Sequence, residues 1–243
     1  MHHANHIGHL GGNLSVIDLL CLIYLDLMRG TDQLVLSKGH AAGALYVCMA
    51  LAGEIDEAEL ESFHQNGTRL PGHPPANTFE KIAFATGSLG HGLSLASGMA
   101  LAEKLRGGDA TIFCVMGDGE WQEGSNWEAI WFAQHHTLSN LTIVVDQNEL
   151  QGFGSIRDTS SMEDLLKRVR SHGIDCSTVD GHNLDALRDA CSLPNKSDGP
   201  RAVFARTLKG KGVPWFEGEM RSHYVPLTDD AAEKALSVLQ AKK

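Results

Sequence analysis

The sequence is poor in aromatic side chains and lacks the features that mark a secreted or membrane-spanning protein. Aromatic residues make up 6% of the 243 residues, and none of the five cysteines forms a CxxC pair. Most of these cysteines lie in apolar runs, so we expect buried free thiols, which suit a reducing cytoplasm. We find no apolar stretch of the roughly 18 residues that a bilayer span needs, and no signal-peptide pattern. We therefore expect a cytoplasmic protein without a membrane partner.

Positive charge is also scarce, since 20 Lys and Arg residues stand against 30 Asp and Glu residues, for a net charge of −10. This balance argues against nucleic acid or an anionic membrane as the main partner. An anionic ligand would need local positive charge from a metal, helix N-termini or a few placed His and Lys residues. No long repeat, low-complexity run or Pro-rich linker divides the chain, so we predict one domain over residues 1–243.

The pattern of apolar residues predicts alternating helices and strands. Asp56 and Thr228 are expected helix caps, Trp127, Ile130 and Trp131 are expected to share one helix face, and the Gly- and Pro-rich residues 65–90 are expected to form a functional loop. Helices are predicted over 14–29, 41–52, 56–64, 91–106, 122–135, 161–171, 183–192 and 228–240. Strands are predicted over 35–36, 111–116, 141–145, 174–179 and 202–206. Continuous apolar strands separated by helices indicate an α/β fold, doubly wound, with a mostly parallel sheet covered on both faces.

Two polar turns follow apolar strands directly and predict a metal site. Gly117-Asp118-Gly119 follows the strand over 111–116, and Asp146-Gln147-Asn148 follows the strand over 141–145. Open α/β sheets bind ligands at the carboxyl ends of their strands, and one crossover separates the two turns. The carboxylate of Asp118 and the carboxamide of Asn148 are hard oxygen ligands that suit Mg²⁺ or Ca²⁺. Such an ion keeps positions for phosphate oxygens, and the flanking glycines let backbone amides approach them.

These residues resemble the metal and diphosphate motif of thiamine-diphosphate enzymes, in which GDG is followed by Asn after about thirty residues. More specifically, the chain is similar to the N-terminal half of a transketolase, whose diphosphate-binding (PP) domain has the thiamine-diphosphate-binding fold. The runs that carry this resemblance keep the family's order and cover nearly the whole chain. They are GHLGGNLS (8–15), LSKGH (36–40), RLPGHP (69–74), TGSLGHGLSLASGMALAEK (86–104), GDGEWQEG (117–124), VVDQN (144–148), VDGHN (179–183) and TLKGKGV (207–213).

The resemblance implies a cofactor and roles for particular residues. Asp118, Asn148 and the backbone carbonyl of Leu150 would bind Mg²⁺, with Ca²⁺ or Mn²⁺ as alternatives. Glu123 would belong to an acidic link between paired sites, and Gly117 would line the cofactor site. The cofactor would be thiamine diphosphate, with His40, Gly119 and His223 against its diphosphate and thiazolium. The backbone of Gly87, Ser88 and Leu89 would position its aminopyrimidine.

Four histidines are the expected catalytic residues. The resemblance implies that His9 and His73 face the substrate, while His40 and His223 help in proton transfer. The reaction removes and returns protons on substrate hydroxyls near neutral pH, where His is the natural carrier. The other histidines, except His91, which borders the cofactor loop, are expected to be structural or solvated, and His182 is among them.

The resemblance also implies a partner, because the family's activating glutamate lies in a second, pyrimidine-binding domain. We expect the pyrimidine-binding and C-terminal domains on a separate C-terminal transketolase subunit, in an α₂β₂ heterotetramer, with a truncated chain as the alternative. The expected reaction transfers a two-carbon ketol unit from a ketose to an aldehyde acceptor, with ketose and aldose phosphates as the substrate class. Alternatives are a deoxyxylulose-phosphate synthase-like or 2-oxo acid dehydrogenase-like component, and a non-catalytic cofactor-binding regulatory subunit. A nicotinamide-binding domain is disfavoured, because no GxGxxG follows a first strand with an acidic residue after it.

Overall fold

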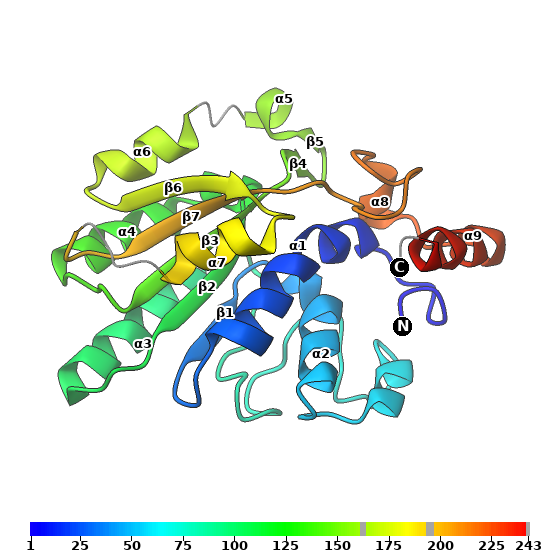
Figure 1. Cartoon of the computed structure of the whole chain (residues 1–243), viewed down its shortest axis with the longest axis horizontal. Coiled ribbons are helices and arrows are strands. Elements are labelled where there is room, and N and C mark those ends of the chain that lie inside the picture. The colour runs from blue at the N-terminus through cyan, green and yellow to red at the C-terminus, as the bar shows by residue number, and fades with distance from the viewer. Residues whose placement is uncertain (161–163, 193–196, 242–243) are drawn as a thin grey trace.

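The computed structural model describes residues 1–160, 164–192 and 197–241, and its centre is a five-stranded parallel sheet (Figure 1). Along the sheet the strands follow the order β1-β2-β3-β7-β6, and all neighbouring pairs are parallel. Their bounds are Gln33–Leu36 (β1), Ile112–Gly117 (β2), Leu141–Gln147 (β3), Asp175–Asp180 (β6) and Arg201–Arg206 (β7). The central strands β2, β3 and β7 are buried along most of their length, as expected for strands covered on both faces.

Helices cover both faces of this sheet, which confirms the predicted doubly wound α/β fold. Neighbouring residues of β1 point to opposite sides, since Leu34 and Leu36 belong to one apolar cluster and Val35 belongs to the other. The first cluster includes residues of α1 (Leu10–Leu22), α2 (Ala42–Leu51) and α7 (Leu184–Ser192). The second includes residues of α3 (Gly92–Arg106), α4 (Gly124–His135) and α6 (Leu165–Ser171).

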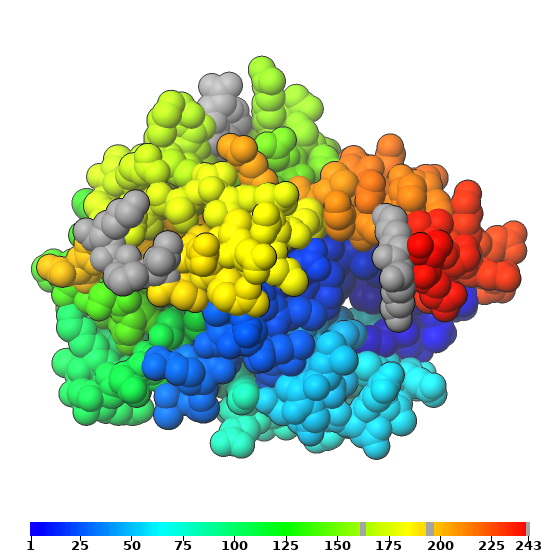
Figure 2. All heavy atoms as spheres, viewed as in Figure 1, coloured from blue at the N-terminus to red at the C-terminus, as the bar shows by residue number. Residues whose placement is uncertain are grey.

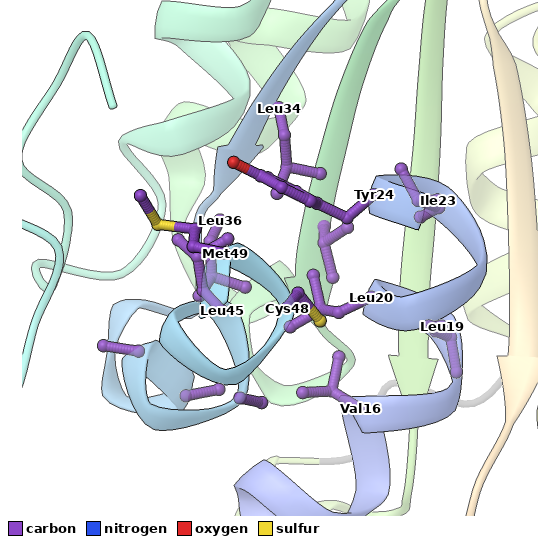
Figure 3. Close-up of a cluster of buried hydrophobic side chains, with 14 of the residues drawn as sticks. Val16, Leu19, Leu20, Ile23, Tyr24, Leu34, Leu36, Leu45, Cys48 and Met49 are labelled. Atoms are coloured by element: carbon purple, nitrogen blue, oxygen red, sulfur yellow. The ribbon is translucent and has the colours of Figure 1, made fainter. Parts of the chain in front are cut away.

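The expectation that no apolar stretch is long enough to span a bilayer is wrong for the segment that contains α1. Residues Leu10–Leu27, comprising α1 and the π-helical turn Ile23–Leu27, form one helix that is long and apolar enough by length and composition. More than half of this helix is buried inside the protein, and core helices pass the same test. Figure 3 shows Val16, Leu20 and Tyr24 of this segment packed against side chains of β1 and α2. Its apolar side chains therefore serve the protein core.

The first helix begins at Leu10, four residues before its predicted start. Its second and third residues are Gly11 and Gly12, which the sequence interpretation left outside the helix. A Cβ added at Gly11 would lie 2.2 Å from Ser222 Oγ, on α8 (Arg221–Tyr224), so a glycine is needed for this close contact. The local pattern could not reveal the contact, because its partner lies near the other end of the chain.

The predicted helix over 56–64 is a 3₁₀-helix over Glu57–Ser62. Asp56 does cap it, accepting a hydrogen bond from the backbone N–H of Ala58 at 3.0 Å. Glu59, three residues after Asp56, has the spacing of a capping box, but its carboxylate accepts two hydrogen bonds from the guanidinium of Arg69, at 2.9 and 2.7 Å. The carboxylate of Glu59 therefore contacts Arg69 and does not complete a capping box at the helix N-terminus.

The prediction that Trp131 shares one helix face with Trp127 and Ile130 is wrong, because its side chain does not lie on the buried face of α4. Ile130 is fully buried and Trp127 is partly buried, whereas Trp131 is 71% exposed. Several short elements were not predicted, among them the hairpin of β4 (Leu150–Gln151) and β5 (Gly154–Ser155), helix α5 (Ile156–Ser160), helix α8 and the 3₁₀ turns Gly39–Ala41 and Gly119–Gln122.

The remaining predicted elements are present within a few residues of their expected bounds. The helix predicted over 161–171 is seen from Leu165, and residues 161–163 lie outside the described residues. Residues 65–90 form no helix or strand, and all five cysteines are free, as expected.

The last helix, α9 (Asp229–Gln240), is capped by Thr228 and reaches the N-terminal residues through a 2.8 Å contact between His3 Nε2 and Asp229 Oδ1. In Figure 2 the red α9 and the dark blue N-terminal residues appear together at one side of the molecule.

Candidate functional site

The residues predicted to bind the cofactor meet in one cavity at the carboxyl edge of the sheet. Asp118 follows β2 directly and Asn148 follows β3, so parallel pairing brings the two turns together. The cavity has a volume of about 530 Å³. All the predicted site residues except Ser88, which is exposed outside it, contribute to its lining: His9, His40, His73, Gly87, Leu89, Gly117, Asp118, Gly119, Glu123, Asn148, Leu150 and His223. Their individual roles stay predictions.

The three predicted metal ligands lie at the base of this cavity. The carboxylate of Asp118 is only 4% exposed and accepts hydrogen bonds from the backbone N–H groups of Gly119, at 2.9 Å, and Glu149, at 2.6 Å. Burial, together with the nearby negative charge of Asp146, raises the pKa of Asp118 to about 7. Asn148 Oδ1 accepts a hydrogen bond from the backbone N–H of Leu150 at 3.2 Å, which fixes the turn between the two residues.

A buried ion pair that the sequence interpretation missed supports this base. Lys38, after β1, donates to the carboxylate of Asp146 at the end of β3, and both side chains are almost fully buried. Ser15 Oγ, at 2.6 Å, and Thr207 Oγ1 also donate to this carboxylate. Burial alone would raise the pKa of Asp146, but the charge of Lys38 and these hydrogen bonds outweigh it and hold the pKa below its usual value.

Lys209 is a second buried cation that the sequence interpretation missed. Its side chain lines the cavity with only 2% of the residue exposed, and its Nζ lies 3.2 Å from the backbone carbonyl oxygen of Leu150. The same ammonium donates to His223 Nδ1 at 2.8 Å. Burial and then the charge of Lys38 lower the pKa of Lys209 to about 8. Lys38 and Lys209 both lie inside runs that carry the family resemblance, LSKGH and TLKGKGV, so a signal for them was present.

Three of the four predicted catalytic histidines form a cluster. The ring centroids of His9 and His223 are 4.8 Å apart, and His40 lies 5.5 Å from His9 and 5.8 Å from His223. Burial is the main reason that the pKa of each imidazole lies below its usual value, reaching about 3 for His223 beside Lys209. The rings are therefore held in the neutral form near pH 7, in which a ring nitrogen can accept a hydrogen bond.

His73 lies across the cavity, against the loop of Gly87. Gly87 has a φ of +153°, and a Cβ there would lie 2.9 Å from His73 Cδ2, so only glycine fits. The pKa of His73 is also lowered, first by burial and then by His64. The 86–90 segment is held by Glu120, another missed residue, whose carboxylate accepts from Gly90 N at 2.9 Å.

Glu120 and Glu123 have different environments despite their closeness in sequence. Glu120 is 2% exposed, also accepts from Ser37 Oγ and from Gly117 N, and has a raised pKa because of its burial. Glu123 lines the cavity but is exposed to solvent. Its carboxylate is therefore accessible to another chain, as the predicted acidic link requires.

The chemistry of the cavity suits a hard cation held by few protein groups. Within the residues that the structure describes, no group of three or more His, Cys, Asp or Glu side chains could hold a metal. One carboxylate, one carboxamide oxygen and one backbone carbonyl instead offer oxygen donors, which is the set that Mg²⁺ uses when phosphate oxygens and water complete its shell. A bound cation would also offset the cost of burying the charge on Asp118.

Comparison with known proteins agrees with this geometry. Residues 8–240 match the family described as transketolase, thiamine diphosphate binding domain. A 6-deoxy-6-sulfo-D-fructose transketolase subunit from Clostridium sp. (strain MSTE9) is 36% identical over 96% of this chain and 89% of its own length. An apulose-4-phosphate transketolase subunit from Actinobacillus succinogenes is 34% identical over 96% of this chain and 88% of its own length.

Solved structures give the same relationship. The transketolase of Campylobacter jejuni superposes with a TM-score of 0.91 and 30% identity, covering 98% of this chain but 40% of its own. The chain thus spans most of the subunit relatives and less than half of this longer transketolase. With its parallel sheet, its cavity and this match over residues 8–240, the chain belongs to the transketolase family as a thiamine diphosphate-binding domain.

Proposed function

We propose that this chain is the N-terminal subunit of a thiamine-diphosphate-dependent transketolase that moves a two-carbon ketol unit from a ketose to an aldehyde acceptor. The observation that carries the proposal is the single cavity in which His9, His40, His73 and His223 surround the predicted metal ligands. A regulatory subunit that only binds cofactor would have no need for this set of neutral imidazoles.

The cofactor's diphosphate would lie at the base of the cavity. Asp118, Asn148 and the carbonyl of Leu150 would hold Mg²⁺, and the ammonium of Lys209 would face the diphosphate. Lys38 is paired with Asp146, so Lys209 is the cation better placed to meet an incoming anion. When bound, thiamine diphosphate supplies the nucleophilic carbon that carries the two-carbon unit between sugars.

The imidazoles would contact the substrate hydroxyls that lose and regain protons during the reaction. His9 Nδ1 is buried and, among the described residues, has no hydrogen-bond partner, so it can meet a substrate hydroxyl. The lowered pKa values of His9, His40 and His73 hold these rings in the neutral form near neutral pH, in which a ring nitrogen can accept a hydrogen bond from a substrate hydroxyl. The backbone N–H of His9 donates to the carbonyl of His223 at 2.6 Å, which fixes the two residues relative to each other.

The subunit names of the relatives support a second chain in the active enzyme. This chain covers 89% and 88% of two relatives that are themselves named as transketolase subunits. We propose that a C-terminal partner supplies the pyrimidine-binding domain, in a cytoplasmic α₂β₂ heterotetramer with ketose and aldose phosphates as substrates. The exposed Glu123 at the cavity mouth would link paired sites in that assembly.

The test is reconstitution. The purified chain, the purified pyrimidine-binding chain and their mixture are assayed with Mg²⁺ and thiamine diphosphate for ketol transfer from a ketose phosphate, with pyruvate as a competing donor. We expect turnover only in the mixture and only from the ketose. Robust turnover by this chain alone, or preference for pyruvate, would overturn the proposal.

A second variant separates catalysis from regulation. His73→Ala in the reconstituted enzyme should reduce kcat strongly while cofactor binding persists, because His73 lies away from the diphosphate end of the cavity. His135→Ala, on the exposed end of α4, is the matched control and should leave kcat unchanged. An unchanged rate in His73→Ala would favour the regulatory role.

A further inference from the structure

His182 is held between helix α1 and the segment that follows β7. Its Nδ1 lies 2.7 Å from Asp18 Oδ2, and its Nε2 accepts a hydrogen bond from the backbone N–H of Leu208 at 2.9 Å. Since Nε2 accepts a hydrogen bond from an amide, it carries no hydrogen. Nδ1 therefore carries the ring hydrogen and donates a hydrogen bond to Asp18. The side chain is only 13% exposed, so the ring is fixed at both ends in a largely buried setting.

The segment that His182 contacts is the one that carries Lys209. On one side, Thr207 N donates to the carbonyl of Gln147 at 3.1 Å, and on the other, Gly210 N donates to the carbonyl of Gly11 at 3.0 Å. Leu208 N, between these two, has His182 Nε2 as its acceptor. Thr207, Leu208 and Gly210 of this segment thus each donate a backbone hydrogen bond to another part of the chain. The acceptor for Leu208 is the side chain of His182, which follows β6.

The orientation of Lys209 depends on this backbone. Its ammonium reaches both the carbonyl of Leu150 and His223 Nδ1, at 3.2 and 2.8 Å, and a long flexible side chain can hold two such contacts only from a fixed Cα position. Loss of the acceptor for Leu208 N would leave the backbone donor of a half-buried residue unsatisfied, which is unfavourable. The segment would then shift to recover a partner, and Lys209 would move with it.

We propose that His182 is a positioning residue of the cofactor site, which aims Lys209 at the diphosphate by holding Leu208. The inference rests on the proposed function in one respect, namely that Lys209 faces a diphosphate. His182 itself touches neither cofactor nor substrate, and it acts as an outer support of the kind that orients groups around metal and phosphate sites.

Two conservative substitutions separate the two ends of the ring. His182→Gln can place an acceptor near the position of Nε2 and so keep Leu208, while it gives up Asp18. His182→Asn can place a polar group near Nδ1 and so keep Asp18, while it is too short to reach Leu208. A merely structural polar contact predicts similar effects in both variants, whereas positioning through Leu208 predicts that only His182→Asn is impaired.

The first measurement reads Lys209 directly in the full-length chain without cofactor. Limited acetylation with acetic anhydride, followed by mass spectrometry, gives the reactivity of Lys209 relative to the exposed Lys104. We expect several-fold faster acetylation of Lys209 in His182→Asn and near wild-type behaviour in His182→Gln. The matched control is His3→Ala, which removes another His–Asp contact, His3–Asp229, at the surface.

The second measurement is calorimetric titration of the reconstituted complex with Mg²⁺ and thiamine diphosphate. His182→Asn should weaken cofactor binding about tenfold, the usual effect of losing an outer support, and His182→Gln should recover most of it. Equal Lys209 reactivity in wild type and His182→Asn, or equal impairment of both variants, would overturn the inference. A wild-type complex that binds no cofactor would instead overturn the proposed function, and the acetylation result would still decide the role of His182.

Discussion

Two buried carboxylates near the cavity show how neighbouring groups set the pKa of a residue. Asp118 and Asp146 are both buried, yet the pKa of Asp118 is raised to about 7 while that of Asp146 is lowered. The main difference is the charge of Lys38, which donates directly to Asp146, and hydrogen bonds from Ser15 and Thr207 add to it. The carboxylate without such an ion pair is the one predicted to bind metal, which fits a group whose charge becomes favourable only when a cation arrives.

Removal of the carboxylate of Asp146, which pairs with Lys38, should lower the stability of the folded chain. Asp146→Asn leaves the ammonium of Lys38 buried without an opposite charge, so we expect the free energy of unfolding to fall by about 3–5 kcal/mol. Urea denaturation measures it. Glu59→Gln, which breaks the more exposed pair with Arg69, is the control and should cost about 1 kcal/mol or less. Equal losses in the two variants would contradict the importance of burial at Lys38.

His40 should make the protein sensitive to mild acid. The pKa of His40 in the folded chain lies well below 6.5, mainly because of burial and then because of Lys38. The unfolded chain therefore takes up a proton below about pH 6.5 that the folded chain refuses, and the free energy of unfolding falls as the pH falls.

The expected contribution of His40 is about 1 kcal/mol of lost stability on going from pH 7 to about pH 5.5. His40→Gln should remove this part of the slope, as measured by urea denaturation at several pH values. His135→Gln, at an exposed position, should leave the slope unchanged. A wild-type slope in His40→Gln would show that the folded chain accepts the proton after all.

At the scale of elements, the sequence predicted best where the residue pattern is long and continuous. The apolar strands over 111–116 and 141–145 were found within two residues of their observed bounds, because buried parallel strands need an uninterrupted apolar run. The hairpin β4–β5 was missed, since two-residue strands carry no periodic signal. The early start at Leu10 was also missed, because the packing of Gly11 against Ser222 brings together opposite ends of the chain.

The same limit explains which site residues could be predicted. Asp118 and Asn148 stand next to apolar strands, and His9, His40 and His73 stand in family runs. The burial of Lys38 could not be read from its neighbours, because its partner Asp146 lies 108 residues further along the chain. Charged residues that stabilise each other across the sheet therefore appear only in three dimensions.

Helix α3 contains two glycines that should respond oppositely to one added methyl group. A Cβ at Gly92 would lie 2.3 Å from Ser37 Oγ and 2.6 Å from Ser37 Cα, whereas a Cβ at Gly98 would meet nothing within 4 Å. Gly92→Ala should cost about 1–3 kcal/mol by overpacking. Gly98→Ala should stabilise by about 0.4–1 kcal/mol, because it restricts the unfolded chain.

Thermal denaturation of the two variants compares them within one helix. Gly92→Ala should also disturb the hydrogen bond from Ser37 Oγ to Glu120, and with it the loop around Gly90. Equal and small effects at both positions would mean that Ser37 can move away from an added methyl group without loss of stability. That outcome would contradict the expected overpacking between α3 and the residue after β1.

At the scale of the whole molecule, the cavity combines polar and apolar groups. The chain carries a net charge of −10, and both cationic and acidic side chains line the cavity beside the four histidines: Lys38, Lys209, Asp118, Glu120 and Glu123. Large apolar side chains surround the same opening, since Phe153 is 91% exposed, Tyr224 55% and Leu89 38%, and all three line the cavity. Exposed apolar groups around a polar cavity are typical of a surface that another protein covers.

The exposed indole of Trp131 gives the protein its own fluorescent reporter. Trp121 is fully buried and Trp127 and Trp215 are partly buried, so Trp131 dominates the red edge of the emission and the quenching by added iodide. Titration with a partner subunit should shift this emission to the blue and protect it from iodide if the partner covers α4. Trp131→Phe should abolish the shift, whereas unchanged emission on binding would place the partner on another face.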